Sequence, residues 1–202
     1  MRRIALDLDG TLITCEARQT EVLRAAIRRR PAEVDPAAAR LAKREGASTA
    51  EALRAQGLTE PLAAEIADIW RSTVEEPAWL ALDHLFPDTL AVLNQLREGG
   101  STLLLVTARS HAHWVPIQLA RLHLRELFDE VVVVPPATAS VAKAGALKAR
   151  RVERLVGDSE ADLNAARQIG VPFVAIDRGQ RSRRYLERAG ATTIVSSLQE
   201  AV

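Results

Sequence analysis

Strand-like and helix-like segments alternate along the second part of the chain, and this alternation constrains the fold more than any other feature. Beyond Pro87, short apolar segments rich in β-branched residues are separated by helical patterns. The predicted strands cover residues 102–106, 130–134, 152–156, 173–176 and 192–195. A further buried strand is predicted at residues 3–8. Strands joined through helices pair in parallel, so the sequence predicts an α/β fold with a parallel sheet and helices on both faces.

One long segment departs from this alternation. Residues 17–76 are rich in Ala, Arg and Glu and follow a helical periodicity. Ser48 and Glu51 have the spacing of a capping box, which predicts a helix start there. Because the segment interrupts the alternating pattern, we interpret it as an α-helical insertion. The predicted domains are a core of residues 1–14 and 86–202 and a helical insertion of residues 15–85.

Composition narrows the class of protein. The formal net charge is +1, so no strongly basic field favours nucleic acid as a partner. Cys15 is the single cysteine, which excludes an intrachain disulfide and fits a reducing compartment. The first apolar run is interrupted at Asp7, too early for a signal peptide, and no segment is long enough to cross a membrane. A cytoplasmic location without membrane partners is therefore expected.

Two acidic runs follow predicted strands at opposite ends of the sequence. Asp7 and Asp9 lie at the end of the first strand, and Asp158 and Asp162 follow the strand at 152–156. Carboxyl ends of parallel strands share one edge of a sheet, so folding should bring these carboxylates together. Such a cluster repels itself unless a cation or a proton neutralises it, which points to a Mg²⁺ site. The competing interpretation is local: Asp7 and Asp9 could cap turn amides, and Ser159 with Asp162 has capping-box spacing.

Two further elements could bind an anion beside this cluster. Thr107 ends a predicted strand, where its hydroxyl and the backbone N–H of Ala108 could bind phosphate oxygens. Lys143 lies near the start of a predicted helix, where its ammonium would neutralise phosphate. Lys148, further along the same helix, is the alternative. Arg109 could reach an anionic group of a substrate, although surface exposure would also explain it.

These residues, in this order, resemble the haloacid dehalogenase superfamily, specifically its phosphatase branch with a helical cap, similar to phosphoglycolate phosphatases. The run from Asp7 to Thr11 resembles the first motif and Thr107 the second. Lys143 resembles the third, and the run Gly157-Asp158 to Asp162 resembles the fourth. The resemblance implies a Rossmann-like core with a C1-type cap inserted between the first and second motifs.

The resemblance also implies a mechanism. Asp7 attacks phosphorus and forms an aspartyl-phosphate, and Asp9 acts as general acid and then as general base. Mg²⁺ is held by Asp7, the backbone carbonyl of Asp9 and Asp158, with Asp162 in support. Thr107, Ala108 and Lys143 hold the transferring phosphoryl group. These roles agree with what phosphoryl transfer requires, which is positioning and charge stabilisation.

The sequence thus favours a Mg²⁺-dependent phosphatase for a small phosphorylated metabolite, because a closing cap excludes bulky substrates. A phosphomutase of the same superfamily shares all these residues and is the nearest alternative. A non-catalytic binding module is a further alternative, although no site residue is missing. A carbon–halogen hydrolase would not need Asp9. Arg18 and Lys43 of the insertion, with Arg109, are the candidates for substrate contact, and a solvated helix face is the competing explanation for the first two.

Overall fold

The computed structural model describes residues 2–28, 30 and 33–202, and their contacts divide the chain into two compact units. The first unit, here called the core, comprises Met1–Thr14 and His84–Val202. The second, here called the insertion, is Cys15–Asp83. Each unit has its own hydrophobic cluster, as expected for parts that bury apolar surface independently.

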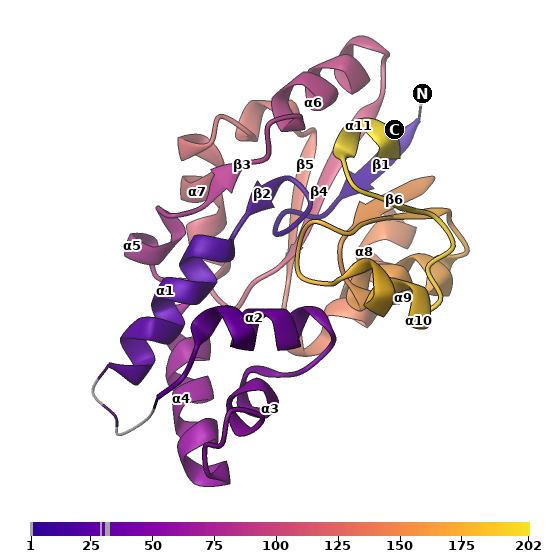
Figure 1. Ribbon diagram of the computed structural model, residues 1–202. Helices are drawn as coiled ribbons and strands as arrows, with labels where there is room; N and C mark the ends of the chain where they lie inside the picture. Colours follow the sequence, from indigo (N-terminus) through magenta and orange to yellow (C-terminus); the bar gives the residue numbers. More distant parts are fainter. Residues whose placement is uncertain (1, 29, 31–32) are drawn as a thin grey trace. The chain divides into compact units, whose positions relative to one another are not determined.

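The core is built on a six-stranded sheet with the strand order β5-β4-β1-β6-β7-β8, in which all pairs are parallel (Figure 1). The strands are β1 (Arg3–Leu6), β4 (Thr102–Ala108), β5 (Glu130–Val134), β6 (Arg154–Gly157), β7 (Phe173–Ile176) and β8 (Ile194–Val195). The predicted α/β fold is therefore confirmed. The order puts β1 between β4 and β6, so three strands that carry predicted site residues are neighbours.

Helices cover both faces of this sheet. The core helices are α6 (Thr89–Glu98), α7 (Val115–Arg121), α8 (Ala139–Ala149), α9 (Glu160–Ile169), α10 (Arg183–Arg188) and α11 (Leu198–Ala201), with the 3₁₀ turns η1 (Ala112–Trp114), η2 (Arg125–Leu127) and η3 (Pro136–Thr138). Helices α6, α7 and α11 contribute to the apolar cluster on one face, and α8 and α9 to the cluster on the other. In β4, Leu103 and Leu105 face the first cluster, whereas Leu104 and Val106 face the second. Because both faces are buried, the strand is apolar throughout its middle.

A short antiparallel ribbon joins the ends of the core at the insertion point. Strands β2 (Ile13–Thr14) and β3 (His84–Leu85) pair with each other, although the whole insertion, Cys15–Asp83, lies between them in the sequence. The ribbon assigns residues 84 and 85 to the core, whereas the sequence analysis had ended the insertion at residue 85. Two-residue strands are too short to leave a periodic signal in sequence.

The insertion contains only helices among its described residues. They are α1 (Glu16–Ile27), α2 (Pro36–Arg44), α3 (Thr49–Arg54), α4 (Glu60–Thr73) and α5 (Pro77–Leu80). The predicted capping box is confirmed at the start of α3: Ser48 Oγ accepts from the backbone N–H of Glu51, and the Glu51 carboxylate accepts from the N–H of Ser48. The helices pack around Leu53 and Ile66, which are fully buried.

A buried ion pair connects the two ends of the insertion. Arg18 in α1 donates through Nε to Oδ1 of Asp83 at 2.9 Å, and through Nη1 to the carbonyl of Val74 at 3.2 Å. Arg18 is 2% exposed and Asp83 is fully buried. A charge buried this deeply needs its partner, so each residue depends on the other for the stability of the insertion.

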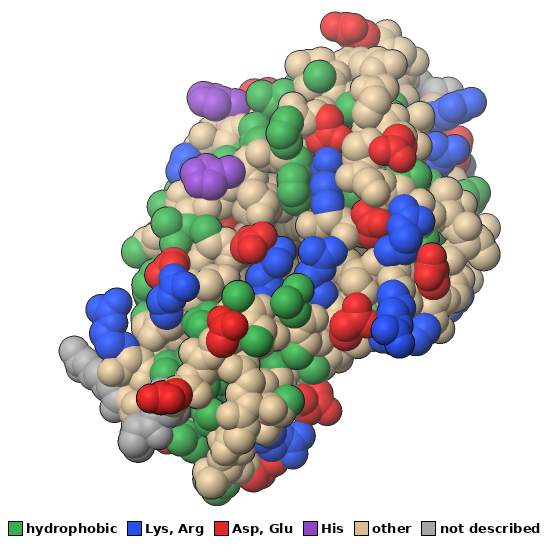
Figure 2. Space-filling view, in the orientation of Figure 1, with side chains coloured by type: hydrophobic (Ala, Val, Ile, Leu, Met, Phe, Trp, Pro, Cys, Tyr) green, Lys and Arg blue, Asp and Glu red, His purple; other side chains and the backbone are tan. Residues whose placement is uncertain are grey.

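Charges of both signs are interspersed at the surface. On the face shown in Figure 2, Lys and Arg side chains lie among Asp and Glu side chains, in keeping with the net charge of +1. Among the residues that the structure describes, no helix has the length and apolar character needed to cross a membrane.

The buried pair generates a stability prediction. We expect Asp83→Asn to destabilise the protein by about 3–5 kcal/mol, because it removes the charge of Asp83 from its buried pair with Arg18. Urea unfolding followed by circular dichroism measures this change. The matched control is Asp68→Asn, which removes the carboxylate of the exposed pair Arg71–Asp68 and should leave stability unchanged. Equal stability of the two variants would contradict the assignment.

Candidate active site at the carboxyl ends of the strands

The loop after β1 presents two carboxylates in a tight turn. Asp7 continues the pairing with β6, since its N–H donates to the carbonyl of Val156 at 3.0 Å. The carbonyl of Leu8 then accepts three backbone N–H groups, from Thr11, Leu12 and Ile13, which folds the chain back on itself. Gly10 has φ of +79°, a conformation that favours glycine. Asp7 and Asp9 are therefore carried on a rigid turn at the sheet edge.

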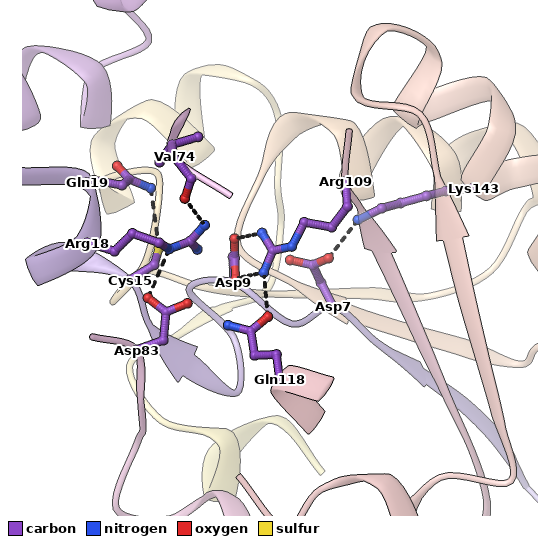
Figure 3. A network of polar contacts seen from close by, with 10 residues as sticks. All are labelled: Asp7, Asp9, Cys15, Arg18, Gln19, Val74, Asp83, Arg109, Gln118 and Lys143. Atoms are coloured by element: carbon purple, nitrogen blue, oxygen red, sulfur yellow. Dashed lines mark hydrogen bonds and ion pairs between the residues drawn. The ribbon is translucent and has the colours of Figure 1, made fainter. Parts of the chain in front are cut away.

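Lys143 lies between two carboxylates from different parts of the chain. Its ammonium donates to Asp7 Oδ1 at 2.8 Å and to Asp162 Oδ1 at 2.6 Å, and Figure 3 shows it pointing toward Asp7. The other oxygen of Asp162, Oδ2, accepts from Ser159 Oγ at 2.6 Å. The proposed capping box of α9 is thus not formed, because the Ser159 side chain makes no cap hydrogen bond and binds the Asp162 side chain instead. Both Asp162 oxygens have partners.

Asp158 is held differently. Its Oδ2 accepts from the backbone N–H of Gln180, in the loop after β7. Its Oδ1 is buried and has no hydrogen-bond partner within the described residues. Two other buried polar atoms are in the same state, Thr11 Oγ1 and Arg178 Nε, but neither belongs to the acidic cluster. Asp158 therefore offers one buried oxygen for a further ligand.

Glycines allow the backbone to approach Asp158 closely. A Cβ added at Gly10 or at Gly179 would overlap the Asp158 carboxylate. A Cβ at Gly157 would lie 2.6 Å from Cγ of Asp162, which is too close. The loops after β1, β6 and β7 can meet around the two acidic side chains only because these positions lack side chains.

The electrostatics of the cluster favour a bound cation. Asp7, Asp158 and Asp162 are buried, and each offers an oxygen within 4.8 Å of the others. Burial raises the pKa of Asp7 to about 7, against the opposing effect of Lys143. Burial, together with repulsion from Asp7 and Asp162, also raises the pKa of Asp158. Burial would lower the pKa of Lys143, but attraction to Asp162 and Asp7 outweighs it and raises that pKa.

The donor set fits a divalent metal ion such as Mg²⁺. One ammonium faces three carboxylates, which leaves two negative charges uncompensated when all are ionised. Carboxylate oxygens are hard ligands of the kind that Mg²⁺ prefers. Asp158 Oδ1, buried without a partner, is the atom that most needs such a cation.

A cavity connects the cluster with the second predicted element. Its volume is about 150 Å³, and it is lined by residues from the end of β4, from the loops after β1, β6 and β7, and from α8 and α9. The lining residues are Asp7, Asp9, Thr107, Ala108, Lys143, Asp158, Ser159, Ala161 and Gln180. The structure thus brings Thr107 and Ala108 to the same cavity as the carboxylates and Lys143. Lys148 lies on an exposed face of α8.

Arg109 forms a second ion pair at this edge of the sheet. Its guanidinium donates to both oxygens of Asp9, with Nη2 2.7 Å from Oδ1 and Nη1 close to Oδ2. Nη2 also donates to Oε1 of Gln118 in α7 at 3.2 Å (Figure 3). Arg109 is 6% exposed and Gln118 is 3% exposed. The Asp9 carboxylate is therefore held by a buried cation, which the sequence analysis did not anticipate.

The two candidate substrate residues of the insertion have partners within it. Arg18 forms the buried pair with Asp83. The ammonium of Lys43 lies 3.6 Å from the ring centroid of Trp70, a cation–π contact. These contacts explain the presence of Arg18 and Lys43 through the packing of the insertion, without a role in substrate binding.

Four site residues were missed in the sequence analysis. Gln118, Ser159, Gly179 and Gln180 lie at or next to the predicted residues. Gly179 and Gln180 follow β7, so the rule that sites form at strand carboxyl ends could have indicated them. Gln118 lies within a helix and has no such signal.

A further ion pair, between Arg178 and Asp88, contacts the loop after β1. Arg178 Nη1 donates to the two oxygens of Asp88 at 2.8 and 3.0 Å, and Nη2 donates to the carbonyl of Thr11 at 2.8 Å. Asp88 Oδ2 also accepts from the N–H of Leu198, at the start of α11. Burial would raise the pKa of Asp88, but the hydrogen bonds from Leu198 and Arg178 outweigh it and lower that pKa.

Comparison with known families agrees with this geometry. A model of haloacid dehalogenase-like hydrolases matches residues 1–170, which contain all four predicted motifs. The chain belongs to this family of hydrolases. Among curated protein sequences, none matches the chain significantly.

Solved structures share the fold. A haloacid dehalogenase-like hydrolase from Streptococcus pneumoniae superposes with a TM-score of 0.80 at 20% identity, covering 100% of this chain and 96% of that one. A predicted phosphatase from Clostridium acetobutylicum has a TM-score of 0.76 at 20% identity, with coverages of 99% and 95%. A predicted phosphoglycolate phosphatase from Haemophilus somnus has a TM-score of 0.73 at 19% identity, with coverages of 100% and 96%. At these identities the likeness concerns the fold.

The glycine contacts predict a loss of metal affinity in Gly179→Ala. The added methyl group must displace the Asp158 carboxylate, so we expect Mg²⁺ or Mn²⁺ to bind at least about tenfold more weakly, as when residues that orient metal ligands are changed. Calorimetric titration of the metal measures this effect without turnover. Gly145→Ala is the matched control, because a Cβ there meets no atom within 4 Å. Equal metal affinity in both variants would refute the role of Gly179.

The lowered pKa of Asp88 predicts a pH dependence of stability. A carboxyl with a depressed folded pKa stabilises above its unfolded pKa of about 3.9, and this contribution is lost as the pH falls through the folded pKa. We expect Asp88→Asn to be less stable than the wild type at pH 7, with the difference shrinking below about pH 4. Urea unfolding across pH 2–7 measures it. A difference that stays constant over this range would contradict the prediction.

Proposed function

We propose that this protein is a Mg²⁺-dependent phosphatase that hydrolyses a small phosphorylated metabolite through an aspartyl-phosphate intermediate. The observation that supports it most is the buried contact of Lys143 with Asp7, beside the unpaired oxygen of Asp158. Membership of the hydrolase family and the likeness to predicted phosphatases add support.

In the first step, an oxygen of Asp7 attacks phosphorus, and the bond between phosphorus and the ester oxygen breaks. Asp9 gives its proton to the departing alcohol oxygen. The Thr107 hydroxyl, the N–H of Ala108 and the Lys143 ammonium stabilise the charge on the transferring phosphoryl oxygens. All these residues line the same cavity.

In the second step, water attacks the phosphorus of the aspartyl-phosphate. Asp9 accepts a proton from this water, and the bond between phosphorus and the Asp7 oxygen breaks. Inorganic phosphate leaves, and both carboxyl groups return to their starting states. One residue thus acts first as acid and then as base.

Asp7, Asp158 and the backbone carbonyl of Asp9 would hold Mg²⁺ in this proposal. Asp162 supports the site through Lys143, since both of its oxygens already have partners. The cation, when bound, supplies positive charge that keeps Asp7 ionised and offsets the charge of the phosphoryl group. This role is supported by the pKa of Asp7, which burial raises to about 7 even with Lys143 beside it.

The size of the cavity supports a phosphoryl group as its occupant. A volume of about 150 Å³ is small beside the roughly 300–1,000 Å³ of sites that enclose drug-sized ligands. All of its lining residues except Ala108 and Ala161 have charged or polar side chains. Such a space suits the phosphoryl end of a substrate together with a metal ion.

A phosphomutase would use the same residues and return the phosphoryl group to the substrate. Product analysis distinguishes the two activities. A phosphatase releases inorganic phosphate in proportion to the alcohol formed, whereas a mutase yields an isomeric phosphoester. A non-catalytic binding module would produce neither.

Phosphate release from a panel of phosphorylated metabolites tests the proposal. We expect activity with Mg²⁺ that disappears with chelator and in Asp7→Asn, which lacks the nucleophile. Lys143→Met should lose at least about 100-fold in kcat/KM, the scale seen when a transition-state charge partner is removed. Lys148→Met, on the exposed face of the same helix, is the matched control and should keep full activity.

Asp9→Asn separates the two chemical steps. We expect its steady-state turnover to fall by at least about 100-fold, as for loss of a general acid–base group, with some phosphoenzyme trapped. Acid quench and mass spectrometry detect the phosphorylated chain. Undiminished turnover in Asp9→Asn, or activity that survives both chelator and Asp7→Asn, would overturn the mechanism.

A further inference from the structure

The ion pair between Arg109 and Asp9 bears on which substrate the site accepts. Both carboxylate oxygens of Asp9 accept hydrogen bonds from the guanidinium. A two-point contact of this kind is among the stronger polar pairs in proteins. Both oxygens are directed at Arg109, so a contact between Asp9 and the alcohol oxygen of a substrate competes with this ion pair.

The proposed function requires Asp9 to exchange a proton with that alcohol oxygen. We therefore expect the contact with Arg109 to open, at least in part, during the reaction. Opening it has a cost, because Arg109 is only 6% exposed and would lose its two-point contact with the Asp9 carboxylate. Another anion in place of Asp9 would remove this cost.

We propose that the second anionic group of a substrate takes the place of Asp9 on Arg109, so that the enzyme selects phosphomonoesters whose alcohol portion carries a carboxylate or another phosphate. The inference rests on the proposed function and deepens it. Arg109 binds the anion, and Asp9 is released toward the departing oxygen. Substrate recognition and the availability of the acid–base group are thereby coupled.

The position of Arg109 suits this exchange. It follows Thr107 by two residues, and its backbone N–H donates to the carbonyl of Val134 at 3.0 Å, which extends the pairing of β4 with β5. The residue is thus anchored at the strand end that carries the proposed phosphate contact. Asp9, its partner, lines the cavity itself.

Gln118 provides an anchor that survives the exchange. Its Oε1 accepts from Nη2 of Arg109 and carries no net charge. It can therefore hold the guanidinium in place without competing strongly with an incoming anion. A carboxylate at this position would compete, because it would pair with Arg109 permanently.

Binding of inert substrate analogues tests the proposal without turnover. The probes are 3-phosphonopropionate and propylphosphonate, which differ in one carboxylate, and propane-1,3-bisphosphonate, which offers a second phosphonate. We expect calorimetry in Mg²⁺ to show that one or both probes with two anionic groups bind at least about tenfold more tightly than propylphosphonate, the size of one charge-assisted pair. The two arms distinguish a carboxylate from a phosphate as the preferred group.

Variants then distinguish replacement of Asp9 on Arg109 from a general attraction between the protein and the anionic probe. In Arg109→Met, the preference for the dianionic probe should fall to about onefold, and in Gln118→Glu it should decrease because the new carboxylate competes. In Asp9→Asn, the preference for a probe with two anionic groups over propylphosphonate should exceed that of the wild type, since the competing carboxylate is gone. Arg184→Met, at an exposed position of α10, is the control and should retain the preference.

Equal binding of all three probes by the wild type would overturn the inference, as would a preference that persists in Arg109→Met. A preference that is the same in Asp9→Asn as in the wild type would show that no exchange occurs. These outcomes are separate from failure of the proposed function, which would appear as no phosphate release from any ester even though the probe preference is present.

Discussion

The site depends on one buried ammonium placed between carboxylates that come from opposite ends of the chain. Lys143 contacts Asp7 after β1 and Asp162 in α9, and all three side chains are buried. Without this cation, burial and mutual repulsion would favour protonated carboxyl groups. With it, the carboxylates can stay ionised, and the ammonium compensates one of their charges. The negative charge that is left favours a divalent ion. The adjacency of β1 and β6 in the sheet makes the arrangement possible.

The acidic residues differ in role because they differ in partners. Asp162 is saturated by Lys143 and Ser159, so it orients the lysine. Asp158 is fixed through one oxygen by Gln180 and keeps the other open. Asp9 is held by Arg109, in contact with Gln118. Similar side chains thus receive different chemistry from their hydrogen bonds, as is general for groups that work at active sites.

Arginine–carboxylate pairs recur as the means of fixing the chain around the site and in the insertion. Arg178 joins Asp88 to the carbonyl of Thr11, and this ties the start of α6 to the loop that carries Asp9. Within the insertion, Arg18 and Asp83 form a buried pair. The planar guanidinium makes several directed bonds at once, which suits it to such junctions. Lysine occurs only at positions 43, 143 and 148, so Lys143 is unusual among the basic residues, most of which are arginines.

The sequence by itself determined the α/β fold, the helical insertion and the short set of residues that could carry the chemistry. Strand–helix alternation and acidic residues after buried strands are local patterns, and such patterns can be recognised in a sequence. Only the tertiary structure decided which atoms meet. Two of these contacts, the β2–β3 ribbon and the ion pair of Arg109 with Asp9, join segments that are distant in sequence. The third is the hydrogen bond from Ser159 to the Asp162 side chain, which forms in place of a helix cap. Their energies depend on burial and on the approach of distant backbone segments, so no local pattern encodes them.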